Sequence, residues 1–263
     1  MIRVMLNNSK YLIKNKIMKR NKKIGRIREE WLDSTINEIA GNSIMLHVSL
    51  RAVKNAFGVP NPFTFLLGRL EKRFTSMIVP GFTHSFEQSR VYHKLFSMPE
   101  DGVFNKLFLP YSSSRTNDAI HSLLVLGPYD FSECDHKNTF SADGCFAKLD
   151  STNTTIVDIG TEDFISTQLH FVESCCKVPY REEKELPGII YYDETHFEHI
   201  EQITTKRLIK AAWNRSKIER YLMARGVLKK YKISNFNIRV FDSRDLRIEI
   251  EKKIYSDPYF LIT

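Results

Sequence analysis

Hydrophobic and polar residues alternate along the first third of the chain in the pattern of a helix, a strand and a second helix. Residues 29–40 place apolar side chains at intervals of three and four, which predicts an amphipathic helix ended by Gly41. The run SIMLHV at 43–48 is largely apolar, as in a buried strand. Residues 49–58 open on a serine suited to capping and close on a glycine, so a second helix is expected to begin where the strand ends.

The same alternation continues downstream and indicates the fold class. The pattern predicts further helices at 62–73, 203–226 and 243–254, and further strands at 76–80, 122–127, 154–160, 188–193 and 235–241. Strands that alternate with helices favour a three-layer α/β arrangement. The long stretches 81–115 and 128–145 are predicted to be loops, and loops of that length usually carry function. The sequence contains no internal repeat and no clear linker, so residues 29–263 are expected to form one domain.

One predicted helix combines an imidazole and a carboxylate with otherwise apolar residues. Thr161 is placed to cap this helix, with Glu162 and Asp163 in its first turn, where the helix dipole favours negative charge. His170 and Glu173 are neighbours on its polar stripe, close enough for the carboxylate to orient the imidazole and raise its pKa above about 6.5. The pair is therefore a candidate general base. The competing interpretation is a partly exposed polar face, because His-x-x-Glu spacing is common.

The positive charge of the chain is concentrated at its N-terminus. The formal net charge is +8, from 39 Lys and Arg against 31 Asp and Glu. Residues 1–28 hold ten of the basic residues and no acidic one, so the remainder is close to neutral. We expect residues 1–28 to be a solvated, poorly ordered basic arm. An arm that contacts nucleic acid or an anionic membrane surface is the alternative, and we consider nucleic acid the less favoured partner.

Composition narrows the class of protein further. A hydrophobic content of 42% with 27% charged residues is typical of a soluble globular protein. No stretch of about 18 apolar residues occurs, so no membrane span is expected, and the arm lacks a signal-peptide core. The four cysteines show no CxxC spacing, which favours reduced thiols and a cytoplasmic location.

Other histidines give weaker signals. The HFEH segment at 196–199 has no third ligand nearby, so we interpret it as a solvated helix face and expect no metal site. His84 beside Ser85 and His121 beside Ser122 lack a Gly-x-Ser-x-Gly elbow. We therefore assign these residues to loops or to the core.

Seven segments carry an independent signal because they occur in register. They are IMLHVSLRAV (44–53), MIVPGF (77–82), DGVFNKLF (101–108), SRTNDAIHSLLVLG (114–127), FAKLDSTNTTIVDIG (146–160), TQLHFVE (167–173) and SDPYFLI (256–262). In this order they resemble the aminoglycoside 3-N-acetyltransferase family, from about residue 29 to the C-terminus. The resemblance implies a three-layer α-β-α fold with a mixed central sheet, distinct from the commoner N-acetyltransferase fold.

The resemblance also implies an activity and a set of site residues. Members transfer an acetyl group from acetyl-CoA directly to a primary amine of an aminosugar or aminoglycoside, without a metal. His170 matches the family's catalytic histidine, Glu173 the adjacent carboxylate, and Thr167 a residue that lines the acyl end of the coenzyme site. The remaining matches concern coenzyme contacts: Ser49, Leu50 and Arg51 match the segment that meets the pantetheine and phosphates, Arg115 and Thr116 the Arg-Ser pair, and Ser122 the serine that follows it.

Elementary chemistry supports a phosphate site at some of these positions. A strand that leads through Ser49 into a helix offers free backbone N–H groups and a positive dipole end. Arg51 and Arg115 would add guanidinium groups suited to the phosphates of CoA. Surface salt bridges are the competing interpretation for both arginines.

The sequence departs from the family pattern in loops that would hold the substrates. Asp118 and Ala119 stand where the family has His-Pro, SADG at 141–144 replaces a Gly-x-x-Ser pattern, and the glycine-rich turn is shortened to GVPNP at 58–62. An amino-sugar intermediate or a small metabolite amine is therefore as well supported an acceptor as an aminoglycoside. A degenerate member that binds CoA without transfer, and a non-catalytic protein that binds anionic partners through its arm, remain alternatives. A homodimer is one oligomeric state open to it.

Overall fold

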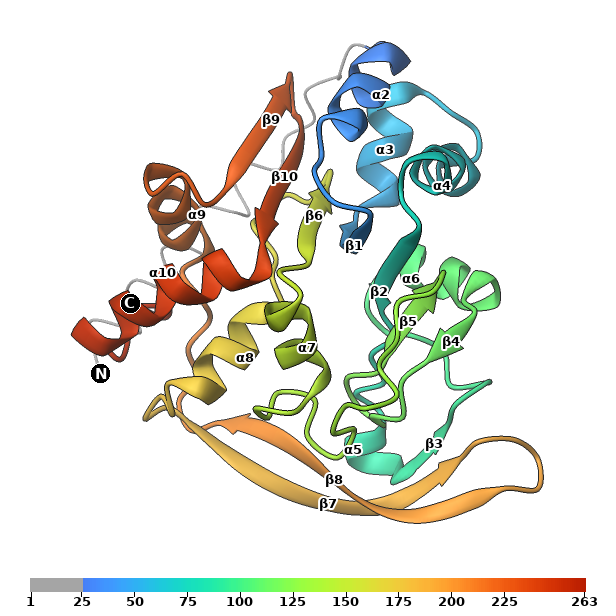
Figure 1. Ribbon diagram of the computed structural model, residues 1–263, viewed down its shortest axis with the longest axis vertical. Coiled ribbons are helices and arrows are strands. Elements are labelled where there is room, and N and C mark those ends of the chain that lie inside the picture. Colours follow the sequence, from blue (N-terminus) through green and yellow to red (C-terminus); the bar gives the residue numbers. More distant parts are fainter. Residues whose placement is uncertain (1–25) are drawn as a thin grey trace.

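A seven-stranded mixed sheet forms the centre of the molecule (Figure 1). The computed structural model describes residues 26–263, so positions 1–25 of the basic arm lie outside the described residues. The strand order is β4-β5-β2-β1-β6-β10-β9. The strands are β1 (Ser43–Val48), β2 (Ser76–Pro80), β4 (Ser114–Arg115), β5 (Leu123–Leu126), β6 (Thr155–Ile159), β9 (Lys229–Ile233) and β10 (Phe236–Asp242). β1 is parallel to both β2 and β6, whereas the outer pairs are antiparallel.

Helices cover both faces of this sheet. Along β1, Ile44 and Leu46 pack with α2, α3, α4 and α6, whereas Met45 packs on the opposite side with α7, α8, α9 and α10. The bounds are α2 (Glu29–Asn37), α3 (Leu50–Phe57), α4 (Pro62–Arg73), α6 (Val103–Phe108), α7 (Cys145–Ser151), α8 (Gln168–Cys175), α9 (Arg215–Ala224) and α10 (Ser243–Ser256). The alternation of a strand between two cores therefore produces the expected three-layer α-β-α fold with a mixed central sheet.

Local capping explains the helix that follows β1. The Ser49 hydroxyl accepts a hydrogen bond from the Ala52 N–H at 3.4 Å, as a helix N-cap does. Gly58 ends α3 with a φ of 68°, a conformation that favours glycine. The predicted strand-to-helix junction at Ser49 is confirmed.

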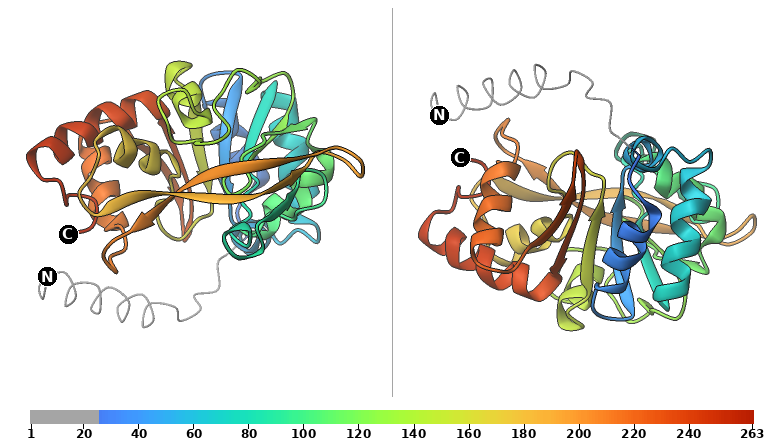
Figure 2. Two further views of the ribbon diagram at one scale, coloured as in Figure 1. Left: turned by 90° about the horizontal axis from the view of Figure 1, so that it is seen from below. Right: turned by 90° about the horizontal axis from the view of Figure 1, so that it is seen from above.

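A second sheet lies across one end of the central sheet (Figure 1, bottom; Figure 2, left). It contains β3 (Val91–His93), β7 (Arg181–Tyr191) and β8 (Phe197–Arg207), and β7 and β8 form a long antiparallel hairpin. Leu186 and Ile190 pack inward with Phe86 of the short helix α5 (Phe86–Ser89) and with Tyr92. The stretch 81–115 also contains the 3₁₀ turn η1 (Leu109–Tyr111), so it is less irregular than predicted.

This hairpin corrects two predictions. The helix expected at 203–226 is wrong in its first part, because the chain up to Arg207 is the strand β8 and only α9 is helical. The HFEH segment likewise belongs to the hairpin and not to a helix face. The buried positions of β8 are Gln202 and Thr204, which are polar. Buried residues alternate with exposed ones in this part of β8, but because the buried ones are polar, the pattern of hydrophobic residues did not predict a strand.

The helix expected to begin at Thr161 also begins later, at Gln168. The buried Arg239 guanidinium donates to the backbone carbonyls of Thr161 and Glu162 at 2.9 and 3.2 Å. The Asp158 carboxyl group accepts from the N–H of Ile165 at 3.0 Å. These contacts from β10 and β6 hold residues 161–166 as an ordered loop, and a helix here would compete with them for the same backbone groups. Within residues 26–263, no helix is both long and apolar enough to cross a membrane.

Candidate active site

A cleft of about 320 Å³ lies at the carboxyl ends of the three adjacent parallel strands β2, β1 and β6. Open α/β sheets characteristically bind ligands at this edge. The strand ends contribute His47, Val48 and Pro80, and the segments beyond them contribute Phe82, Asp101, Gly102, Asn105, Thr161, Ile165, Thr167 and Arg215. Thr167, which the sequence resemblance placed beside the acyl group, therefore lines this cleft directly.

Several polar groups of the cleft have no protein partner among the described residues. His47 is more than nine-tenths buried, and its Nε2 makes no hydrogen bond within residues 26–263. The pKa of His47 is lowered to about 4, chiefly by burial; the charge of Asp101 acts in the opposite direction and that of Arg215 adds to the lowering, so the ring is neutral at neutral pH. The Arg215 guanidinium makes no hydrogen bond or ion pair with any residue in the described part of the chain. A neutral imidazole, and a cation that has no ion-pair partner within residues 26–263, are thus available to a ligand.

The predicted histidine–carboxylate pair is formed on α8, one turn beyond Thr167. His170 Nδ1 lies 3.1 Å from Glu173 Oε2. A carboxylate only accepts hydrogen bonds, so Nδ1 carries the ring proton and Nε2 keeps its lone pair. The His170 side chain is 24% exposed to solvent, whereas the Glu173 side chain is fully buried. The ring can therefore exchange a proton with a ligand while its partner stays shielded from water.

Glu173 is held by three further side chains from outside its helix. Trp213 Nε1 and the Tyr180 hydroxyl donate to Oε1 at 2.7 and 3.0 Å. Arg181 Nε lies 2.7 Å from Oε2 as an ion pair. The partners are up to 40 residues distant in sequence, and no local spacing in the sequence could have identified them. They fix the carboxylate, which in turn fixes the imidazole.

The electrostatics of this pair differ from the prediction. Burial lowers the pKa of His170 to about 4, and it outweighs the hydrogen bond that His170 donates to Glu173, which acts in the opposite direction. The prediction of a raised pKa was therefore wrong, because it considered the carboxylate but not the loss of solvent. Burial also raises the pKa of Glu173, but the contacts with His170, Arg181 and Trp213 more than offset this and lower it overall. The pair is a neutral imidazole beside a carboxylate at neutral pH.

Aromatic rings enclose the imidazole. The Trp213 ring centroid lies 4.5 Å from that of His170, and the Phe140 centroid lies 5.4 Å from it. Phe140 belongs to the long stretch 128–145 that was predicted to carry function. These rings supply the desolvation that lowers the His170 pKa.

The other predicted coenzyme residues occupy varied positions. Ser49 caps α3 directly after the cleft residue Val48, so it borders the cleft. Leu50 is buried in the core, and Arg51 is exposed on α3. The role of these residues in coenzyme binding stays a prediction.

Arg115 and Ser122 fix one wall of the cleft. The buried Arg115 guanidinium donates to the Gly81 carbonyl at 2.6 Å and to the Ser122 hydroxyl at 3.0 Å. Ser122 also donates to Gly81 O at 2.8 Å, and the Thr116 hydroxyl accepts from the Leu123 N–H at 2.8 Å. Gly81 lies between Pro80 and Phe82, which both line the cleft. The guanidinium is thus directed at protein carbonyls, and its predicted contact with CoA phosphates is left without support from this geometry.

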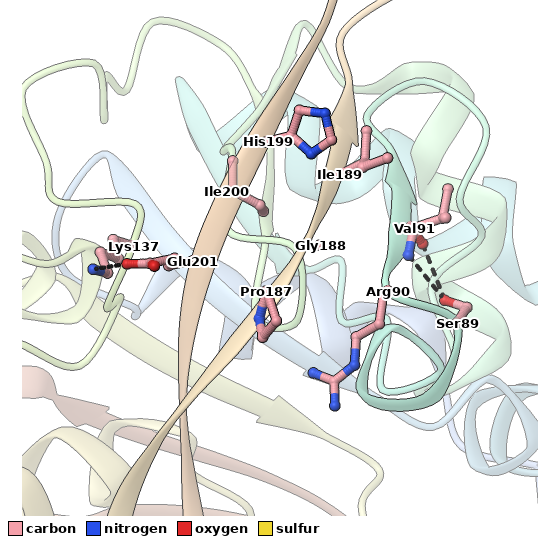
Figure 3. A pocket seen from close by; sticks show the side chains of 10 residues that line it. All are labelled: Ser89, Arg90, Val91, Lys137, Pro187, Gly188, Ile189, His199, Ile200 and Glu201. Carbon is pink, nitrogen blue, oxygen red and sulfur yellow. Dashed lines mark hydrogen bonds and ion pairs between the residues drawn. The ribbon is translucent and has the colours of Figure 1, made fainter.

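A larger hollow, of about 860 Å³, lies along the second sheet (Figure 3). Arg90 stands on one side of it, and the ion pair of Lys137 with Glu201, at 3.2 Å, stands on the other. None of its lining residues also lines the cleft beside His170. Its size therefore does not mark the reacting centre. Within residues 26–263, no three His, Cys, Asp or Glu side chains are grouped so as to hold a metal ion.

Comparison with known proteins agrees with this fold. The apoenzyme of aminoglycoside acetyltransferase AAC(3)-IVa is similar with a TM-score of 0.68 and 15% identity, over 92% of this chain and 94% of that one. A binary complex of AAC-IIIb with CoASH gives 0.69 and 13%, over 88% and 97%. The YokD protein of Bacillus subtilis gives 0.68 and 14%, over 89% and 96%. Identities this low show the fold alone.

Sequence comparison is more specific. No curated protein matches the chain. However, the family model described as aminoglycoside 3-N-acetyltransferase matches residues 45–254, which contain most of β1, the cleft, the α8 pair and most of α10. A match over most of the chain, on a fold that the solved acetyltransferases share, leads to one conclusion: the chain belongs to the aminoglycoside 3-N-acetyltransferase family and is an acyltransferase.

Proposed function

We propose that this protein transfers the acetyl group of acetyl-CoA to a primary amine of an aminosugar or aminoglycoside-like acceptor, with His170 as general base. One observation carries the proposal. His170 has its Nδ1 proton fixed by a fully buried carboxylate, and it lies one helical turn from a ligand cleft at the carboxyl edge of the sheet. A base that is oriented, neutral and partly accessible is what amine acylation requires.

The cleft residues suit the coenzyme end of the reaction. Arg215 offers a guanidinium to a phosphate, and the unpartnered His47 Nε2 offers a hydrogen-bonding group to an amide such as those of pantetheine. Ser49 and the N-terminus of α3 border the same edge, and Thr167 lines it beside the base. We assign Arg115, Thr116 and Ser122 to shaping the wall at Gly81. The solved complex of AAC-IIIb with CoASH is consistent with coenzyme binding by this fold.

The lowered pKa of His170 indicates at which step of the reaction the proton of the amine is transferred to it. An imidazole with a pKa of about 4 is too weak a base to deprotonate a free ammonium group, whose pKa is about 10.4 in lysine. The acceptor must therefore enter as the neutral amine, having already lost its ammonium proton to solvent, and its nitrogen becomes far more acidic once it bonds to the acyl carbon. His170 therefore accepts the proton as this bond forms, and Glu173 stabilises the imidazolium. Holding the two reactants together supplies much of the remaining rate enhancement.

Acidic side chains favour a cationic acceptor. The hairpin of β7 and β8 carries exposed carboxylates at Glu182, Glu183, Glu185, Glu198 and Glu201. Glu183 accepts a hydrogen bond from Asn138 at 3.0 Å, two residues before the Phe140 that packs on His170. One of these carboxylates is thus tied to the segment that packs on His170, whereas Glu185 and Glu201 are paired with Lys137. AAC(3)-IVa has been solved in complex with apramycin, and an acceptor of that class is the one proposed here.

The test is a thiol-release assay with acetyl-CoA against aminoglycosides, nucleotide-linked amino sugars and simple amines. We expect at least one amine to be acetylated, and His170→Gln to lose about 10² to 10⁴ in rate while still binding CoA. An unchanged rate in that variant would remove His170 from the mechanism. Thermal stabilisation by acetyl-CoA without thiol release for any amine would instead identify a protein that binds the coenzyme and transfers nothing.

A further inference from the structure

A second histidine–carboxylate pair lies at the mouth of the same cleft. His84 Nε2 is 3.1 Å from Asp101 Oδ2, and Asp101 lines the cleft. His84 follows β2, and Asp101 precedes α6, so the pair joins two segments on one side of the opening. The two side chains keep 46% and 55% of their exposure. This pair is accessible to a ligand, and the mechanism above does not use it.

A row of rings connects His84 to His170. The Phe82 ring lines the cleft and lies edge-on to His84 and to His121, with centroid distances of 6.1 and 5.2 Å. His121 then packs on Phe140 at 4.9 Å, and Phe140 packs on His170 at 5.4 Å. A continuous series of ring contacts therefore links the two histidine–carboxylate pairs. Phe82, near the His84 end of this series, lines the cleft. A thioester that enters along Phe82 would therefore pass beside Asp101, the partner of His84, and beside Thr167, one turn before His170.

The charged groups around His84 favour its protonated form. Asp101 supplies negative charge through the direct contact, and Glu100 and Glu87 add to it from the segment before α6 and from α5. Burial opposes them but is smaller in effect than the contact with Asp101, so the pKa of His84 is raised. His121, the remaining titratable neighbour at 6.1 Å, has its pKa lowered well below the usual value by burial and stays uncharged.

We infer that His84, held by Asp101, is a second catalytic histidine, the general acid that protonates the sulfur of the departing coenzyme. This inference rests on the proposed acetyl transfer. The amine nitrogen forms a bond to the acyl carbon and gives its proton to His170. The bond between that carbon and sulfur breaks, and the electron pair goes to sulfur, which takes the proton of the His84 imidazolium. The products are an amide and a free thiol, and solvent returns the proton from His170 to His84.

The decisive measurement is the ratio of variant to wild-type rate across pH, because this ratio cancels the ionisation of the acceptor. We expect His84→Gln to be about 10²-fold slower at the acid end of the range. The deficit should disappear as pH rises through the His84 pKa, because the wild-type acid is itself deprotonated there. Asp101→Asn should begin to lose rate at a lower pH than wild type, because the pKa of His84 falls when the carboxylate is removed. His196→Gln, at the exposed turn of the hairpin, is the matched control and should track wild type throughout.

A second readout uses leaving-group chemistry. S-phenyl thioacetate and S-acetyl-N-acetylcysteamine both lack the nucleotide, but the aryl thiolate departs without protonation. The His84→Gln deficit should shrink with the phenyl donor, and the His170→Gln deficit should be the same with both.

The outcomes separate the two proposals. If wild type and His84→Gln show the same rates at every pH while His170→Gln is inactive, the His84 assignment is overturned and the acetyl transfer stands. A His84→Gln deficit that is equal at all pH values and for both donors means a structural tie between the two segments and also overturns it. If the wild-type protein acetylates no amine, both proposals fall.

Discussion

Two histidine–carboxylate pairs in this molecule have the same contact distance and opposite electrostatics. His170 and Glu173 lie 3.1 Å apart, as do His84 and Asp101. Burial lowers the pKa of His170 to about 4, whereas the contact with Asp101 raises that of His84. The carboxylate acts in the same direction in both pairs. The difference shows that solvent access, and not the presence of a carboxylate partner, decides which imidazole is neutral and which is readily protonated.

The surroundings of the two carboxylates differ in the same way as those of the imidazoles. Glu173 has no exposure and is satisfied by Trp213, Tyr180 and Arg181 in addition to His170. Its negative charge is therefore shared, and less of it reaches the imidazole. Asp101 is more than half exposed and has His84 as its ion-pair partner. The buried carboxylate of Glu173, which has several partners, orients its histidine. The exposed carboxylate of Asp101 favours the protonated form of its histidine.

The largest expected effect comes from removing the buried imidazole. His170→Gln should reduce turnover by about 10² to 10⁴ with little change in folding, because the side chain keeps 24% of its exposure and one hydrogen-bonding partner. Steady-state rates and a thermal melt check this. A variant that melts normally but transfers at the wild-type rate would show that the buried pair is structural.

Removing the buried carboxylate should cost stability instead. Glu173→Gln leaves Arg181 without its ion pair in a nine-tenths buried position, and such changes cost about 3–5 kcal/mol. Urea denaturation measures the loss. The matched variant Asp101→Asn breaks an exposed pair and should cost no more than about 1 kcal/mol. Equal losses in the two variants would contradict the comparison.

Removing one shared hydrogen bond should have an intermediate effect. Trp213→Phe keeps an aromatic ring against His170 but deletes the 2.7 Å bond to Glu173. A hydrogen bond to a charged group contributes about 1.5–3 kcal/mol, so the free energy of unfolding should fall by that amount. Because Glu173 then has more charge to offer His170, the pKa of the imidazole should also rise, which NMR titration of the ring can follow.

The last expected effect is on the pH dependence of stability. The folded-state pKa of His170 lies below its unfolded value of about 6.5, so the unfolded chain takes up the proton first. Its contribution to stability is present above about pH 6.5 and is lost as pH falls through about 4. Denaturation midpoints at several pH values should show this loss in wild type, and His170→Gln should show less of it.

The sequence was most informative where local chemistry decides the structure. The capped helix after Ser49, the buried strand of residues 43–48 and the adjacency of His170 and Glu173 follow from spacing and capping alone, and all three are present. The sequence failed at β8, where the inward positions are Gln202 and Thr204, and at Thr161, where Arg239 holds the loop. In both cases, partners distant in sequence satisfy polar groups that a local pattern treats as solvent-exposed.

The sequence by itself determined five strands of the central sheet, the family and the one-turn spacing of an imidazole and a carboxylate. The tertiary structure alone decided that Trp213 and Phe140 desolvate His170, that Glu173 is shared with Arg181, and that His84 meets Asp101 at the cleft. The physical reason is the distance along the chain over which each interaction acts. Helix geometry and capping act over about one turn, whereas a pKa depends on every charge and on the water that the folded chain brings to the group or excludes from it.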